Sequence, residues 1–141
     1  MRPALAMLGA TAFAVFLAYS PVIAAVTPDQ FPPKTTGDLI ALCSAQKDDP
    51  LMTAAVNFCQ GFAEGVVEVA LGYEAVTRKD RQPFCLPSPR PTHNQALAQF
   101  VAWAQADPAR MADPPVVGVL HFLIQQYPCS RPTALPKAKK Q

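Results

Sequence analysis

The chain has 141 residues, half of them hydrophobic, and a formal net charge of +2, a length that suits a single domain. Between Val26 and Cys129, seven basic and ten acidic residues give a net charge of −3. No stripe of basic residues is present in the sequence, so the composition argues against a protein that binds nucleic acid.

The first 25 residues have the three parts of a secretory signal peptide. Arg2 supplies a positive charge, residues 4–19 contain no charged side chain, and the small residues Ala24 and Ala25 suit cleavage after either of them. The alternative is a membrane anchor, but the apolar run is shorter than the ~20 residues that a spanning helix needs. We therefore expect a signal peptide at 1–25, a periplasmic domain at 26–131 without stable membrane insertion, and a disordered basic tail at 132–141.

Two helices are predicted in the first half of the exported chain. A cap in Thr36-Gly37-Asp38 starts a short amphipathic helix that ends near Ala45. Asp49-Pro50 then starts the longest helix, at about residues 51–73. Apolar residues recur in this second helix at every third or fourth position, which predicts one face packed on a core.

Two glycines lie inside this second helix. Gly61 and Gly65 are one turn apart on a face beside the apolar stripe, and each destabilises a helix by about 1 kcal/mol relative to alanine. A backbone packed very close to this face would offset that loss. We therefore expect Gly61 and Gly65 to pack against another helix, either within the domain or across a dimer.

Two more helices are predicted after a proline-rich connection. The prolines between residues 83 and 91 exclude a helix there, and Thr92 with Gln95 forms a capping box that starts the third helix. Asp113-Pro114 is the start signal of the fourth helix, which ends near Gln126. Because this fourth segment is apolar almost all round, we expect it to be buried on most sides.

These elements predict an all-α fold, a small four-helix antiparallel bundle-like domain with two disulfides. Four cysteines in an exported chain favour two disulfides, and their spacings of 16, 26 and 44 positions match no Cys-x-x-Cys zinc or redox motif. Three pairings are possible from the sequence alone. If the first helix pairs with the second and the third with the fourth, the hairpin geometry favours Cys43–Cys59 and Cys85–Cys129.

Few residues in the sequence have a pattern suited to chemistry. Glu64 and Glu68 are four positions apart on one helix face, which acid–base catalysis could use, but such pairs are common on exposed faces. His93 and His121 lack the further ligands that a metal site requires. We therefore predict no catalytic site, no cofactor and no metal.

A surface for binding a protein partner is the remaining candidate site. It comprises Glu64 and Glu68 on the second helix and the basic residues Arg78, Lys79 and Arg81 of the following loop. A run of charges is usually no more than a solvated loop. Stiffened by the prolines after it, the loop would instead present a fixed surface to a partner.

From Phe31 to Cys129 the chain resembles the Rap/Tai family of type VI amidase immunity proteins. The resemblance is carried by short motifs in a fixed order with the cysteines: Thr36-Gly37-Asp38-Leu39, Leu42-Cys43, Cys59-Gln60-Gly61-Phe62, Gly65-Val66, Phe84-Cys85-Leu86-Pro87, Gln95 and Tyr127-Pro128-Cys129. One departure is Ser88-Pro89-Arg90-Pro91, which is richer in proline than the family's usual entry to the third helix.

This resemblance implies a periplasmic, all-helical and often dimeric protein without catalytic activity. It further implies that the protein partner is a peptidoglycan amidase effector of a type VI secretion system, whose active site the immunity protein occludes. Two alternatives stay open, a periplasmic helical chaperone or stress protein and an orphan binding module. Two disulfides argue against a chaperone that unfolds in order to work.

Overall fold

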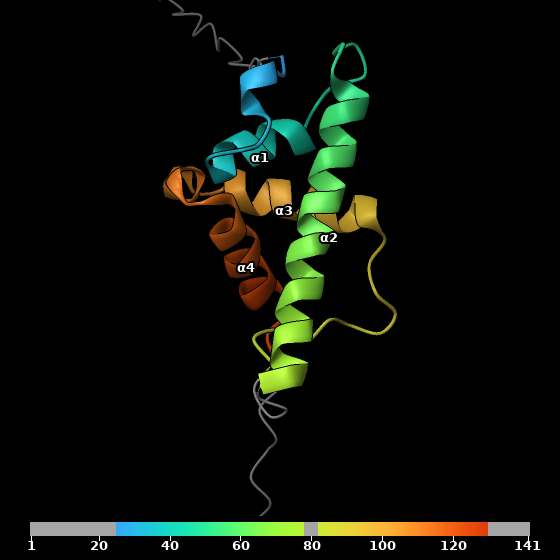
Figure 1. Ribbon diagram of the computed structural model, residues 1–141, viewed down its shortest axis with the longest axis vertical. Helices are drawn as coiled ribbons and strands as arrows, with labels where there is room; N and C mark the ends of the chain where they lie inside the picture. The colour runs from blue at the N-terminus through green and yellow to red at the C-terminus, as the bar shows by residue number, and fades with distance from the viewer. Residues whose placement is uncertain (1–24, 78–81, 130–141) are drawn as a thin grey trace, which may run out of the picture.

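The computed structural model describes residues 25–77 and 82–129, which form four α-helices and two short 3-10 helices and contain no strand (Figure 1). The all-α fold with two disulfides is therefore confirmed. All but the last residue of the predicted signal peptide, the predicted tail at 132–141, and Arg78, Lys79 and Arg81 lie outside the described residues. Within the described ranges, no helix is both long and apolar enough to cross a membrane.

Helix α1 spans Thr36–Cys43 and follows the 3-10 helix η1 at Pro28–Gln30. Its N-cap is Thr35, whose hydroxyl accepts from the Asp38 backbone N–H at 3.1 Å, while the Asp38 carboxylate accepts from the Thr35 N–H at 3.0 Å. This reciprocal capping box satisfies two backbone donors that a helix start leaves unpaired. The predicted cap was therefore placed one residue too late, and α1 ends two residues before Ala45.

Helix α2, Met52–Thr77, is the longest element. The turn before it is fixed by Asp49, whose carboxylate accepts from the Leu51 N–H at 2.7 Å and from the Val26 N–H at 2.6 Å. The helix extends one turn beyond the predicted end near Tyr73. Its second half carries exposed apolar side chains, among them Val69 and Val76 at 72% and 87% exposure.

The second half of the chain contains α3 (His93–Gln105), the 3-10 helix η2 (Pro108–Ala112) and α4 (Pro115–Gln126). The capping box predicted for α3 is confirmed, with Thr92 and Gln95 bonded reciprocally at 2.9 and 3.3 Å. The predicted start of α4 was wrong in detail. Its N-cap is Pro114, which makes no side-chain cap, and Asp113 instead ends η2.

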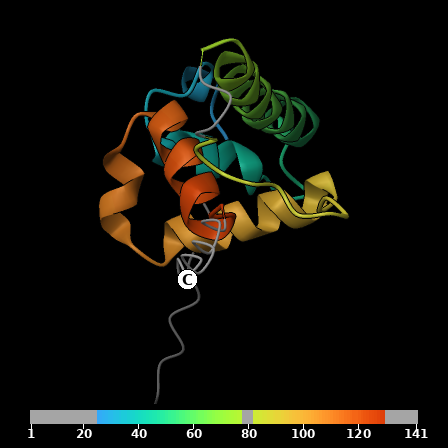
Figure 2. The same cartoon turned by 90° about the horizontal axis from the view of Figure 1, so that it is seen from below.

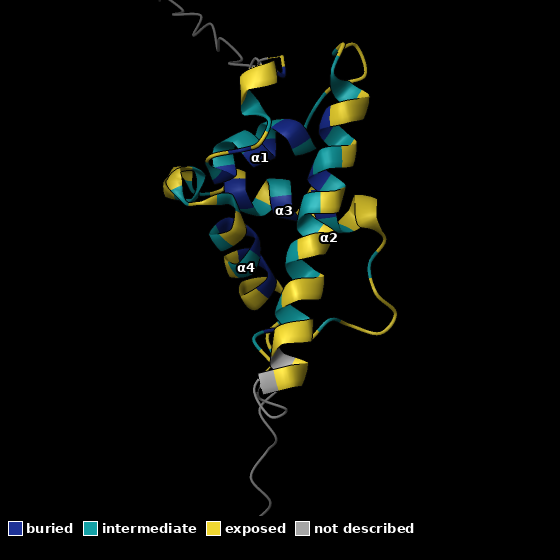
Figure 3. Ribbon diagram, in the orientation of Figure 1, coloured by how far each residue is buried: buried dark blue, intermediate teal, exposed yellow. Residues whose placement is uncertain are grey.

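Helix α1 lies at the centre of the domain and packs against α2, α3, α4 and η2. Both views place α3 across the long axis of α2 rather than alongside it, so the four helices are not all parallel or antiparallel (Figures 1 and 2). The buried apolar residues form one core and come from all four helices (Figure 3) and from the segment before α3. They include Leu39, Leu42, Ala55, Cys59, Phe84 and Ala104.

The contact between α1 and α4 depends on one buried hydroxyl and one glycine. Thr36 is fully buried, and its hydroxyl donates to the backbone oxygens of Asp113 and Pro114 at 3.1 and 3.3 Å. A Cβ added at Gly118 would lie 2.2 Å from the Thr36 hydroxyl oxygen. Glycine at position 118 therefore allows α4 to approach α1 closely.

Both disulfides have the pairing that the hairpin geometry favoured. Cys43–Cys59 joins the last residue of α1 to the first half of α2, and Cys85–Cys129 joins the segment before α3 to the end of the described chain. Beside the second disulfide, the Cys85 N–H donates to the Tyr127 carbonyl at 2.8 Å. The two disulfides thus hold both ends of the domain against its core.

The prediction that α4 is buried on most sides was wrong. Val119, Phe122 and Leu123 are buried, but Val116 and Ile124 are 45% and 42% exposed. The sequence is apolar almost all round, yet only one face of α4 meets the core, and the other face lines an open depression between α4 and α2.

Candidate functional site

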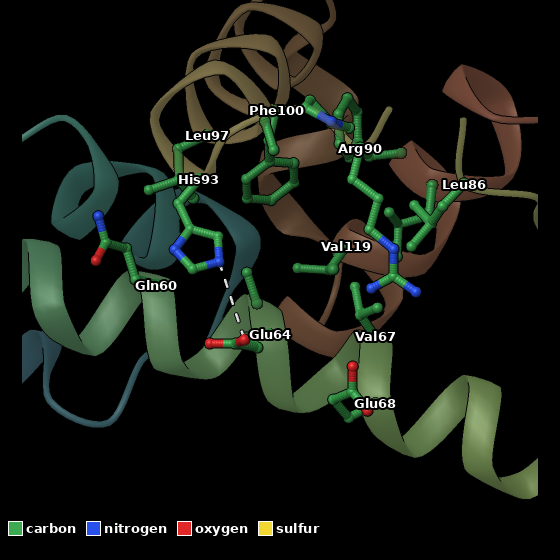
Figure 4. A pocket seen from close by; sticks show the side chains of 15 residues that line it. Gln60, Glu64, Val67, Glu68, Leu86, Arg90, His93, Leu97, Phe100 and Val119 are labelled. Carbon is green, nitrogen blue, oxygen red and sulfur yellow. Dashed lines mark ion pairs between the residues drawn. The ribbon is translucent and has the colours of Figure 1, made fainter. Parts of the chain in front are cut away.

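A pocket opens between α2, the segment before α3, and α3 itself (Figure 4). Its volume is about 160 Å³. The floor is formed by buried side chains of α3 and α4, including Leu97, Phe100 and Val119, so the pocket reaches down to the core. The polar residues Gln60, Glu64, Glu68, Arg90 and His93 form the rim, named here the charged rim.

An ion pair crosses the charged rim. His93, in the first turn of α3, lies with Nε2 3.9 Å from the Glu64 carboxylate of α2, and the two side chains are 70% and 61% exposed (Figure 4). The pair attracts only when the imidazole is protonated. Exposed ion pairs contribute little to stability. The relevant feature of this contact is its position, because it lies at the mouth of the pocket with the Glu64 carboxylate.

The opposite flank of α2 forms a second, wider depression with α4, named here the apolar groove. It has a volume of about 660 Å³, and no charged side chain is among the described residues that line it. Gly61 and Gly65 line it on α2, and Val116, Leu120 and Ile124 line it at helical spacing on α4. Exposed contiguous apolar surface of this kind is typical of a face that meets a partner.

The two glycines of this groove do not pack against another helix of the chain. A Cβ added at Gly61 or Gly65 would meet nothing within 4 Å among the described residues. The expectation of a close helix contact within the domain was therefore wrong. Packing of these glycines across a dimer stays a prediction.

A family model for Rap1a immunity proteins matches residues 35–129. The chain belongs to the Rap1a immunity protein family. The matched range begins at the N-cap of α1 and ends at Cys129, so it contains all four helices and both disulfides. No curated protein and no solved structure matches the chain.

Membership in the Rap1a family confirms the resemblance found in the sequence. An immunity protein acts by binding a protein effector, so the family implies an inhibitor with a protein partner rather than an enzyme. In a Rap1a protein, the surfaces of interest are therefore those that a folded partner can reach. The charged rim and the apolar groove are two such surfaces.

The structure brings some of the predicted site residues of this Rap1a protein together and separates others. Glu64, Glu68 and His93 meet at the charged rim, whereas His121 lies apart on α4, with Nδ1 3.6 Å from the Asp113 carboxylate. No group of three or more His, Cys, Asp or Glu residues suited to a metal occurs within the described ranges.

Sequence reasoning did not single out Arg90 within the proline-rich connection and missed the pocket itself. Arg90 stands in the proline-rich segment, two positions before the N-cap of α3, and nothing in its sequence neighbours marks it. The capping box at Thr92 was the available signal, because it places residues 90–93 at the start of a helix. Only the tertiary structure, in which α3 crosses α2 with its first turn near Glu64, brings that start to the pocket.

Proposed function

We propose that this protein is a periplasmic immunity protein that inhibits a peptidoglycan amidase effector of a type VI secretion system. The observation that carries the proposal is the match to the Rap1a immunity proteins over the whole disulfide-bonded domain. The sequence of residues 1–25, which is typical of a signal peptide, supports export. Disulfides also suit an oxidising compartment.

Inhibition by occlusion requires a rigid surface and tight binding. An immunity protein must hold its effector inactive wherever both exist, which calls for an affinity on the order of nanomolar or better. A stable interface of this kind buries at least ~1,200 Å². We propose that the charged rim forms part of that interface. Its residues lie on α2 and at the start of α3, and both helices pack on the same core.

The basic loop is the second proposed contact. Residues 78–81 follow α2 directly, and Glu64 and Glu68 lie on the same helix. We place Arg78, Lys79 and Arg81 in the interface together with the two carboxylates. Steric exclusion of substrate needs no titrating group, so the proposed inhibitor requires neither a catalytic residue nor a cofactor.

A homodimer is the proposed assembly, and the apolar groove is its proposed interface. The groove combines exposed valine and isoleucine side chains with two glycines that leave the α2 backbone open. A twofold interface uses the same patch on both copies. A patch without charge can meet its own copy without repulsion between like charges.

Co-expression tests the proposed function. A candidate type VI amidase effector is directed to the periplasm with or without this protein, and lysis is followed by optical density. We expect survival with the full chain and lysis when residues 2–25 are deleted, because the inhibitor then stays in the wrong compartment. A catalytically inactive amidase is the control. Lysis in the presence of the exported protein would overturn the proposal.

A further inference from the structure

The pocket under the charged rim is large enough to hold one side chain. Its volume of about 160 Å³ is similar to that of the ~150 Å³ apolar cavity engineered in another protein that binds benzene. Its floor consists of side chains that are otherwise buried, with Leu97 at 9% and Phe100 and Val119 at 3% exposure. An apolar group that entered the pocket would therefore extend the core.

The charge at the pocket mouth favours a cation. Glu64 and Glu68 lie one helical turn apart, and like charges at this spacing repel. Arg90 contributes a permanent positive charge to the rim. Among the described residues, however, no ion pair within 4.0 Å joins its guanidinium to the Glu64 or Glu68 carboxylate. Apart from His93, the rim carries two carboxylates and one guanidinium, so negative charge exceeds positive charge there.

We propose that this pocket is the anchor site for one apolar side chain of the effector, with a lysine or arginine of the same segment beside Glu64 and Glu68. The identity of the partner rests on the proposed function, whereas the chemistry of the occupant rests on the pocket. The apolar side chain displaces water from the floor, and the cation relieves the repulsion between the two carboxylates. Buried anchors of this kind dominate the binding energy of many protein interfaces.

Three small molecules with the same ring test the pocket without the effector. Benzylamine, benzyl alcohol and benzoate carry a positive, a neutral and a negative group. Each is titrated into the exported protein, and binding is followed by NMR on the methyl groups of Leu97 and Val119. We expect benzylamine to bind most tightly and benzoate least. Equal binding of benzylamine and benzoate, or no shift at these methyl groups with any of the three, overturns the proposal.

Substitutions on the rim test the role of the carboxylates. The double variant Glu64→Gln, Glu68→Gln should bring the affinities for benzylamine and benzoate close together, because both negative charges are gone. Asp48→Asn is the matched control, since Asp48 is an exposed acid outside the pocket. It should leave the preference for benzylamine unchanged. A preference that persists in the double variant shows that the carboxylates do not select the occupant.

A variant with a filled pocket links the site to the effector. Ala96 lines the pocket from α3, so Ala96→Leu places additional carbon atoms inside it. We expect the loss of benzylamine binding and about a tenfold or greater loss of affinity for the amidase, measured by calorimetry with circular dichroism as the check of folding. Ala54→Leu, at an exposed position of α2 away from the pocket, should change neither.

The two kinds of failure are distinguishable. If the unmodified protein does not bind the amidase, the proposed function fails, and the small molecules still test the pocket. If it binds the amidase and folded Ala96→Leu binds equally well, the pocket is not the anchor site. Should Ala96→Leu not fold, the carboxylate double variant decides the question, because unchanged affinity for the amidase then overturns the proposal.

Discussion

The buried hydroxyl of Thr36 and the glycine facing it determine how closely α1 and α4 pack. The Thr36 hydroxyl and the Thr36 backbone N–H both donate hydrogen bonds to backbone oxygen just before α4. The N–H donates to the Asp113 carbonyl oxygen at 2.7 Å. No Cβ fits at Gly118, because it would overlap the Thr36 side chain. A methyl group there must therefore separate the helices or break these hydrogen bonds.

We predict that Gly118→Ala destabilises the protein by about 1–3 kcal/mol through overpacking. Alanine has the better helix propensity by about 1 kcal/mol, so without the clash the variant would be more stable. Urea denaturation measures the change. Gly72→Ala is the matched control, because an added Cβ there meets nothing within 4 Å among the described residues, Gly72 does not line the apolar groove, and only the gain in propensity remains. Equal stabilisation by both substitutions would contradict this account of Gly118.

The capping box of α1 predicts a dependence of stability on pH. Burial acts to raise the pKa of Asp38, but hydrogen bonds from the Lys34 and Thr35 N–H groups and the Thr35 hydroxyl outweigh it, so the pKa lies below its ordinary value of 3.8. A carboxyl whose pKa is lower in the folded state stabilises the fold above its unfolded pKa. This contribution is lost as pH falls below about 4 toward the folded pKa.

Asp38→Ala should therefore destabilise the protein by about 1 kcal/mol at neutral pH and by less in acid. Thermal unfolding of both proteins across this pH range measures the difference. Asp48→Asn serves as the control, because Asp48 is exposed and belongs to no capping box. A difference between Asp38→Ala and the unmodified protein that stays constant down to acid pH would show that the cap does not depend on ionisation.

At the scale of elements, the two disulfides close loops of different length around a small core. Cys43–Cys59 spans 16 positions and Cys85–Cys129 spans 44. The loop-entropy estimate gives about 3 kcal/mol for the shorter loop and about 4 kcal/mol for the longer one. Both are large fractions of the 5–15 kcal/mol that is typical of a domain.

We predict that Cys85→Ala with Cys129→Ala lowers the free energy of unfolding by about 2–4 kcal/mol. Cys43→Ala with Cys59→Ala should destabilise the fold as well, with an added loss from the space that fully buried Cys59 leaves in the core. Denaturant unfolding of the two double variants measures both changes. No change in the 85/129 variant would indicate that the Cys85–Tyr127 backbone bond and helix packing suffice at this end.

At the scale of the whole molecule, the apolar groove predicts self-association. Gly65→Leu should leave the fold of the single chain intact, because an added Cβ meets nothing there within 4 Å among the described residues. It should shift a dimer toward monomer, measured as molar mass by light scattering. Thr53→Leu, an exposed position on α2 outside the groove, should leave the mass unchanged. A dimer that survives in Gly65→Leu would place its interface elsewhere.

The sequence by itself determined the helices and their approximate ends, and the expected helix hairpins favoured one of three possible disulfide pairings, which the structure confirms. These depend on short-range physics: apolar periodicity, the capping box at Thr92 and the hairpin spacing of the cysteines. The cap of α1 was displaced because Thr35 and Thr36 are equally good caps locally. The burial of the Thr36 side chain under α4 assigns the N-cap to Thr35.

Only the tertiary structure decided which helical faces are covered. One face of apolar α4 is open and lines the apolar groove with α2, and the glycines of α2 are exposed whereas Gly118 packs closely against α1. The charged rim likewise exists only because the start of α3 lies beside the middle of α2, bringing His93 within 3.9 Å of Glu64. Such contacts depend on helix crossing, which periodicity within one segment does not encode.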